Sequence, residues 1–142
     1  MMKQPDTLGF LIGDVHRLMR RHFQQQLEGS CLTLAQARAL VHIARCEGMR
    51  QVELAERLDI QPITLARQLD QLAQSGLVER RPDPDDRRAH QLFLTEAAMP
   101  HLQRIKQAGD VVHRSAMGDL DEEAANALRQ ALKTMHDNLS HC

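Results

Sequence analysis

The sequence predicts a mainly α-helical protein with one small β-hairpin near its middle. Apolar residues recur at the three- and four-residue spacing of an α-helix in six segments of the chain. Between residues 77 and 94 this spacing gives way to two short strand-like segments, separated by a turn rich in Pro and Asp. The chain has 142 residues, of which 42% are hydrophobic and 26% charged, a composition typical of one globular unit.

The two ends of the chain predict long amphipathic helices. The first begins after Thr7 and ends at residues 29–30. A later helix begins after residues 95–96, where Pro100 should delay its regular start, and the last begins at Asp121, an acidic residue that suits the positive end of a helix dipole. The first and last helices carry broad apolar stripes, at Leu8, Leu11, Ile12, Val15, Leu18, Met19, Phe23 and Leu27 and at Leu128, Leu132, Met135 and Leu139.

Three shorter helices precede the hairpin. The first of them starts at a capping box on Thr33 and stops near residues 47–48. A two-turn helix follows at residues 51–58. The third occupies about residues 62–75 and opens on Pro62, because proline is favoured in the first turn of a helix.

The last two of these helices have the spacing of a helix-turn-helix, two short helices joined by a three-residue turn. Their apolar residues are spaced to pack against each other, at Leu54, Ala55, Leu58, Ile60, Leu65 and Leu69. The second helix leaves a polar face that can read base edges in DNA, at Gln61, Thr64, Arg67, Gln68 and Gln71. The alternative at this point is a plain pair of packed helices whose polar residues only face water.

The hairpin that follows carries arginines at its tip. Its strands are predicted at residues 77–81 and 89–94, with Asp86, Arg87 and Arg88 in the loop between them. A narrow hairpin tip with arginines can enter a DNA minor groove, and the Asp86 carboxylate is expected to accept the Arg88 guanidinium and hold it extended. The alternative is a surface turn whose charges neutralise one another. A helix-turn-helix joined directly to such a hairpin is much rarer than either alone, and together they predict a winged helix-turn-helix.

Residues 51–96 contain four specific motifs, namely L-A-x-x-L at residues 54–58, Arg67-x-x-Asp70-x-Leu72 with Gly76-Leu77-Val78 after it, Asp86-x-Arg88, and Leu94-Thr95. With these motifs the segment resembles the MarR/SlyA family of bacterial transcription regulators. The flanking helices also agree in number and length, so the resemblance covers essentially the whole chain. Two positions depart from the family pattern: Ala97-Ala98 stands where glycine is frequent, and Asp59 stands where glycine often occupies the turn.

The resemblance implies a homodimeric repressor or activator that binds double-stranded DNA. Residues 1–32 and 95–142 would form a helical dimerisation region, and residues 33–94 a winged helix-turn-helix DNA-binding domain with its recognition helix at about 62–75 and its wing at about 78–94. The implied contact residues are Thr64, Arg67 and Gln68 for base reading, Gln61 and Pro62 for the DNA backbone, and Arg88 held by Asp86 for the minor groove, with Arg87 as the alternative at the wing tip.

Charge and aromatic content restrict how such a protein can bind DNA. Only 2% of residues are aromatic, which argues against recognition by base stacking. The net charge is −1, and residues 45–90 hold eight basic against nine acidic side chains. Positive potential must therefore come from the placement of a few arginines, and we expect modest nonspecific affinity.

Regulators of the resembled type commonly bind small aromatic ligands between the dimer helices and the winged domain. The candidate lining residues are Leu11, Val15, Leu40 and Ile43, with His16 or His42 as the polar group. The alternative, which we favour from the sequence alone, is that these are ordinary core and interface residues.

Other classes of function find less support in the sequence. It has no Ser/His/Asp constellation, no phosphate-binding loop and no H-E-x-x-H motif, so an enzyme is not expected. No cofactor or metal is expected, although a zinc-sensing relative could combine Cys31, His42, Asp110 and His113. A relative that senses oxidants through a cysteine and a winged helix that only docks proteins are further alternatives. The cysteines, Cys31, Cys46 and Cys142, are predicted to be reduced. No apolar run reaches the roughly 20 residues that span a bilayer, and the start lacks a secretory signal pattern, so a cytoplasmic protein with no membrane contact is expected.

Overall fold

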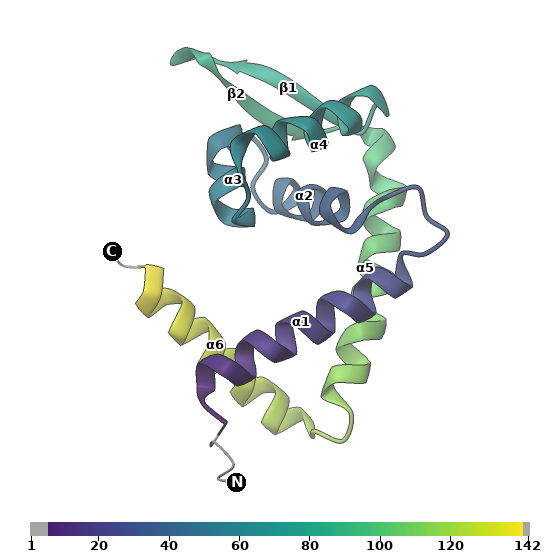
Figure 1. Ribbon diagram of the computed structural model, residues 1–142, viewed down its shortest axis with the longest axis vertical. Helices are drawn as coiled ribbons and strands as arrows, with labels where there is room; N and C mark the ends of the chain where they lie inside the picture. Colours follow the sequence, from purple (N-terminus) through teal and green to yellow (C-terminus); the bar gives the residue numbers. More distant parts are fainter. Residues whose placement is uncertain (1–5, 141–142) are drawn as a thin grey trace, which may run out of the picture.

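The computed structural model describes residues 6–140, and within them six α-helices surround and extend from one β-hairpin (Figure 1). This confirms the predicted fold class. Two helix ends fall two or three residues earlier than expected, because Leu27 and Cys46 leave the helix as C-caps. The elements are α1 Leu8–Gln26, α2 Leu34–Arg45, α3 Gln51–Leu58, α4 Pro62–Gln74, β1 Val78–Asp83, β2 Asp86–Leu94, the 3₁₀ turn η1 Glu96–Ala98, α5 Met99–Met117 and α6 Glu122–Ser140.

The main core lies where α2, α3, α4 and the hairpin meet. The capping box predicted at Thr33 is present, with Thr33 Oγ1 accepting from Gln36 N at 3.1 Å and Gln36 Oε1 accepting from Thr33 N at 3.0 Å. The turn between α3 and α4 places Asp59 in the left-handed region (φ 54°, ψ 48°), the conformation for which related turns use glycine. The largest fully buried side chains are Leu40, Ile43, Leu54, Leu65, Leu69, Leu72 and Leu92.

The hairpin differs from the sequence prediction in the length of its strands. β1 continues through Pro82 to Asp83, where we expected a turn from residue 82 onward, and the turn is confined to residues 84–85. Proline is tolerated in this strand because a two-stranded sheet leaves each strand one free edge. The longer strands carry the tip of the hairpin further from the core than predicted.

Helix α5 connects the two ends of the molecule. Pro100 falls in its first turn and the 3₁₀ turn η1 precedes it, as Pro100 predicted. At its wing end, Thr95 Oγ1 donates to the carbonyl of Gly76 at 2.6 Å, and Thr95 N donates to the carbonyl of Leu77 at 3.1 Å. Figure 1 shows α5 running from the base of the hairpin down to α1 and α6.

Helices α1 and α6 lie at the end of the molecule opposite the wing, and neither contains a buried residue (Figure 1). No helix within residues 6–140 has the length and apolar character to cross a membrane. The exposed apolar side chains of α1 are Leu8, Phe10, Leu11, Ile12, Val15, Leu18 and Met19, and those of α6 are Leu128, Leu132 and Leu139.

Candidate nucleic-acid interface

Helix α4 turns its apolar side to the core and its polar side to solvent. Leu65, Leu69 and Leu72 are buried, whereas Thr64 and Arg67 are exposed. The Arg67 side chain makes no hydrogen bond or ion pair with any described residue. It is therefore available to an external partner.

The polar residues at the start of α4 and on its partly buried side differ in exposure and in hydrogen bonding. Gln61 is the N-cap without a side-chain capping bond, Pro62 occupies the first turn, and both are exposed. Gln68 is half-buried, and its Oε1 is buried without a donor among the described residues. Gln71 Oε1 accepts from Gln36 Nε2 of α2 at 3.0 Å. Of the predicted base-reading residues, Thr64 and Arg67 are thus the most accessible.

An arginine that the sequence analysis did not single out joins the wing to α4. Arg80 Nη1 of β1 donates to Asp70 Oδ1 at 2.6 Å, and its Nη2 donates to the carbonyl of Ala66 at 3.0 Å. These bonds fix β1 against the recognition helix and neutralise an acid on it. The only sequence signal was the motif position of Asp70, because the partner lies ten residues away in another element.

The turn of the wing is built on a buried carboxylate. Asp83 Oδ1 accepts from the backbone N–H of Asp85 at 2.8 Å, and Asp83 Oδ2 accepts from Arg50 Nε at 2.7 Å. The hydrogen bond from Asp85, followed by the bond and charge of Arg50, lowers the pKa of Asp83 below its ordinary value, although burial opposes this. An ionised Asp83 therefore holds the turn and ties it to the start of α3.

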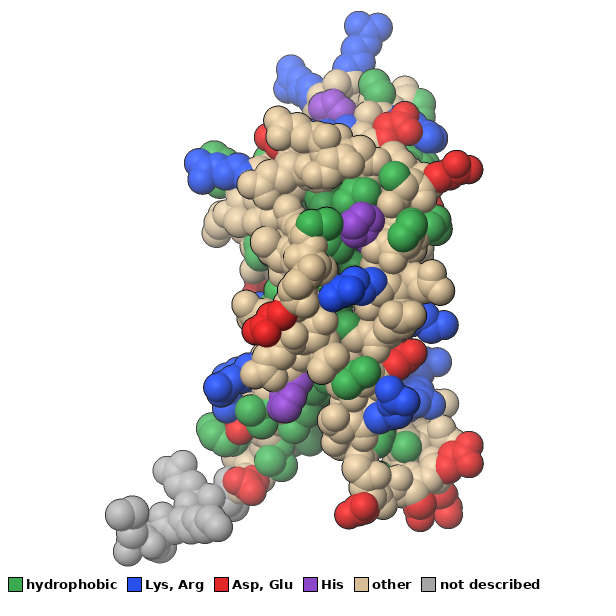
Figure 2. Space-filling model, turned by 90° about the vertical axis from the view of Figure 1, so that its right-hand side faces the viewer, with side chains coloured by type: hydrophobic (Ala, Val, Ile, Leu, Met, Phe, Trp, Pro, Cys, Tyr) green, Lys and Arg blue, Asp and Glu red, His purple; other side chains and the backbone are tan. Residues whose placement is uncertain are grey.

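The wing arginines stand on a bulge. Pro82 pairs with His90 but the next residue, Asp83, pairs with Asp86, so residues 87–89 are extra residues on β2. A bulge re-aims side chains away from the regular strand. Arg87 and Arg88 are both exposed, and Figure 2 shows Lys and Arg side chains projecting from the end of the molecule that carries the hairpin.

Asp86 acts differently from the expectation. Its Oδ1 accepts from the backbone N–H of Arg88 at 3.0 Å, and no ion pair joins it to a guanidinium within the described residues. Aspartate commonly bonds the backbone two residues ahead in this way, which satisfies the carboxylate locally. Asp86 therefore shapes the backbone of the bulge, and both wing arginines keep free side chains.

The fold and part of the sequence match known winged-helix regulators. The model of the MarR family matches residues 32–90. Wild-type MarR from E. coli without ligand has 28% identity and a TM-score of 0.81, covering 94% of this chain and 98% of its own. A MarR crystal structure without a stated organism has 26% identity and a TM-score of 0.86 over 99% and 95% of the two chains. A cysteine-to-serine mutant of E. coli MarR complexed with operator DNA has 29% identity and a TM-score of 0.73 over 90% and 92%.

Residues 32–90 form a MarR family domain. The chain is a winged helix-turn-helix protein, and the family of this domain is one of DNA-binding transcriptional regulators. The family match covers α2, α3, α4 and most of the hairpin, which are the elements that carry the exposed arginines described above.

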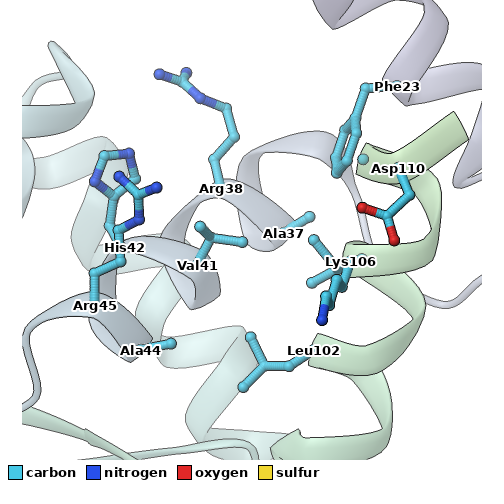
Figure 3. Close-up of a pocket in the computed structure, with 12 residues that line it drawn as sticks. Phe23, Ala37, Arg38, Val41, His42, Ala44, Arg45, Leu102, Lys106 and Asp110 are labelled. Carbon is cyan, nitrogen blue, oxygen red and sulfur yellow. The ribbon is translucent and has the colours of Figure 1, made fainter. Parts of the chain in front are cut away.

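The chain also has a cleft between α2 and α5, with a volume of about 570 Å³. Figure 3 shows the lining residues Arg38, His42 and Arg45 on α2 and Lys106 and Asp110 on α5, with Ala37, Val41 and Leu102 between the two groups. The apolar part of its lining comes mainly from Phe23, Ala37, Val41, Leu102 and Ile105.

Three cations and one acid give this cleft a positive character. Burial, followed by the charges of Arg38, Arg45 and Arg57, lowers the pKa of His42, so its imidazole is neutral at pH 7. Burial and the neighbouring Arg20 lower the pKa of Arg38, which nevertheless stays charged. Arg38, His42 and Arg45 share one face of α2 at helical spacing, a signal present in the sequence that we did not use.

The structure brings only one of the six predicted ligand residues into this cleft, namely His42. Leu40 and Ile43 are fully buried in the core, because they lie on the opposite face of α2. Val15 lines a separate hollow between α1 and α5, and Leu11 and His16 are exposed on α1.

The metal and redox alternatives gain no geometric support from the described residues. Within residues 6–140 no group of three or more His, Cys, Asp or Glu side chains is placed to hold a metal ion. Cys31 and Cys46 are exposed free thiols, and Cys142 lies outside the described residues.

The pKa of Asp83 predicts an acid-sensitive wing. Because this pKa is lowered in the folded protein, the ionised carboxylate stabilises the fold at every pH above the ordinary value of 3.8, and that contribution is lost as the pH falls through the folded pKa. We expect Asp83→Asn to be less stable than wild type at about pH 7, with the difference shrinking towards about pH 2. Urea unfolding at fixed protein concentration measures this difference. Asp85→Asn, in the same turn, serves as control, and a wild-type advantage that is independent of pH would contradict the assignment.

Proposed function

We propose that this protein is a homodimeric, sequence-specific transcriptional regulator that places α4 in the major groove and the wing in the minor groove of an operator. The observation that carries the proposal is the contrast between paired and unpaired arginines. Arg50, Arg80 and Arg81 each pair with a carboxylate of their own domain, whereas Arg67, Arg87 and Arg88 have no such partner among the described residues. These three arginines lie on the two elements that a winged helix presents to DNA. Arg45 and Arg57 also lack an ion pair among the described residues, but they lie on α2 and α3.

In this proposal α4 and the wing recognise DNA through different interactions. Thr64, Arg67 and Gln68 read base edges, with Arg67 suited to a guanine through two parallel hydrogen bonds. Gln61 and Pro62 lie against the DNA backbone at the start of α4. Arg88 or Arg87 enters the minor groove, where a narrow groove concentrates negative potential.

A protein-docking winged helix is the competing function. Docking a protein does not in general require unpaired arginines on both the recognition helix and the wing. A partner protein with a matching acidic surface would use them, so a direct DNA-binding measurement is needed to separate the two functions.

The DNA proposal predicts that two arginine variants lose operator affinity. In a gel-shift titration with the DNA upstream of its own gene, we expect Arg67→Ala and Arg88→Ala each to weaken specific binding about tenfold or more, since one base contact contributes about 1–3 kcal/mol. Arg114→Ala is the matched control, because Arg114 is an exposed arginine at the far end of α5. Absence of a specific shift by wild type, or equal affinity of all variants, would contradict the proposal.

The proposed dimer is supported by the apolar surface that the single chain leaves uncovered. α1 and α6 have no buried residue, although both are amphipathic and carry large exposed apolar side chains. Exposed apolar surface of this extent is typical of an interface. We assign residues 1–32 and 95–142 to dimerisation and residues 33–94 to DNA binding, and a two-fold dimer would present two α4 helices to a palindromic site.

The dimer proposal predicts that charged residues placed on α6 lower the molecular mass of the protein in solution. Sedimentation equilibrium should give wild type the mass of two chains, and Leu128→Glu with Leu132→Glu should shift it towards the 16.1 kDa monomer. Both leucines are 43% exposed in the single chain, so the change does not disrupt its core. Val52→Glu, at a residue 55% exposed on α3 in the winged domain, is the control expected to stay dimeric. A monomeric wild type would overturn the proposal.

We further assign a small aromatic ligand with an anionic group to the cleft between α2 and α5. The apolar lining suits an aromatic ring, and Arg38, Arg45 and Lys106 suit a carboxylate or phenolate. The neutral His42 can serve as hydrogen-bond donor or acceptor beside them.

The ligand proposal predicts charge-dependent stabilisation. Benzoate should raise the melting temperature of wild type in a thermal-shift titration, whereas benzyl alcohol, its neutral analogue, should do so much less. Arg38→Gln is expected to remove the benzoate effect and Arg114→Gln to preserve it. Equal shifts with both compounds, or none, would contradict the assignment.

A further inference from the structure

The outward face of α4 carries an apolar side chain that the assignments above leave unused. Ile63 is the second residue of the helix, and 67% of it is exposed. A single exposed apolar side chain is common on protein surfaces. Its position is what matters here, because Ile63 lies next to Thr64 and one helical turn before Arg67.

The geometry of the helix places Ile63 on the DNA-facing side. Residues four apart lie on the same face of an α-helix, so Ile63 and Arg67 project in the same direction. Leu65, Leu69 and Leu72 occupy the opposite face and are buried. If Arg67 reaches a base edge, Ile63 lies beside it in the same groove.

A hollow beside the start of α4 reaches the wing. Pro62 and Val52, which is 55% exposed, line this hollow together with Arg88 of the wing bulge. Ile63 follows Pro62 in the first turn of α4, on the side that the proposed function turns to DNA. An exposed apolar side chain at this place is best matched by an apolar group of the DNA.

DNA offers one such group in the major groove. The base edges there present hydrogen-bond donors and acceptors, and the C5-methyl group of thymine is their apolar feature. Isoleucine has no polar atom in its side chain, so against other base edges it would remove water from polar groups without replacing their hydrogen bonds. Contact with a thymine methyl avoids that cost and buries apolar surface on both sides.

We propose that Ile63 is a specificity-determining residue that packs against the C5-methyl group of one thymine in each half-site. The proposal rests on the proposed function, since it requires α4 to enter the major groove. It adds an apolar component to recognition by Arg67, so that the preferred half-site contains a thymine close to the guanine read by Arg67.

The test removes the methyl group from the DNA and the side chain from the protein separately. Wild type first selects a preferred duplex from a randomised pool, and each thymine of that duplex is then replaced by deoxyuridine, which pairs identically but lacks the methyl group. At one position in each half-site we expect deoxyuridine to weaken wild-type binding about fourfold, the factor for one buried methyl group. Ile63→Ala should weaken binding to the thymine duplex by at least that factor and become insensitive to deoxyuridine at that position.

Two further variants make the result specific. Ile63→Val keeps a branched apolar side chain and should retain sensitivity to deoxyuridine, as should Gln74→Ala, which alters an exposed residue in the last turn of α4. Because Ile63 is exposed, its truncation leaves the core intact, and circular dichroism melting verifies this.

The outcomes separate this inference from the function on which it rests. If a duplex is selected but deoxyuridine affects wild type and Ile63→Ala equally at every position, the assignment of Ile63 is wrong while sequence-specific binding stands. If no preferred duplex emerges from the pool, the proposed function fails and the assignment fails with it.

Discussion

A buried carboxylate at the end of β1 sets the geometry of the wing. Asp83 accepts hydrogen bonds from the turn at Asp85 and from Arg50 at the start of α3, so one side chain connects the hairpin tip to the helix-turn-helix. A buried charge left without these partners would be strongly unfavourable, which means that the turn and Arg50 are fixed together. The bulge that carries Arg87 and Arg88 begins directly after this turn. The direction of the wing arginines therefore depends on a residue that itself has no access to DNA.

Ion pairing within the winged domain determines where its positive potential lies. The charges of basic and acidic side chains nearly cancel between residues 45 and 90, so the net charge of this segment does not attract DNA phosphates. The ion pair between Arg80 and Asp70 compensates the negative charge of an acid on α4, and Arg81 similarly pairs with Glu79. Arg67, Arg87 and Arg88 have no ion-pair partner among the described residues, and they lie on neighbouring elements. A domain of nearly zero net charge can thus attract DNA at its unpaired arginines, while the rest of its surface attracts DNA only weakly.

Local patterns predicted the helices, but contacts between distant residues determine much of the site. The capping box at Thr33 and the delayed helix start at Pro100 both act within a few residues, and both were predicted correctly. The extent of β1 was missed because the burial of Asp83 depends on Arg50, 33 residues earlier in the chain. Leu40 was a candidate for the ligand site as well as for the core, because apolar periodicity does not distinguish a face that meets the core from one that meets a cleft. Both cases concern which surface an element meets, and that depends on residues distant in the chain.

The length of α5 gives the cleft a mechanical role in the proposed regulator. This helix has 19 residues, about 28 Å at 1.5 Å per residue, and links the wing base to α1 and α6. The cleft lies between α5 and α2, and α2 belongs to the core that holds the recognition helix. In a dimer the two recognition helices must lie about one DNA turn, roughly 34 Å, apart. A ligand that fits the cleft better at one angle between α2 and α5 would favour one spacing between the two recognition helices of the dimer. The ligand could change DNA affinity by no more than the ratio of its own affinities for the two arrangements of α2 and α5. Because Arg38, Arg45 and Lys106 come from both helices, an anion bridging them would draw the helices together, and the cleft would then select the spacing.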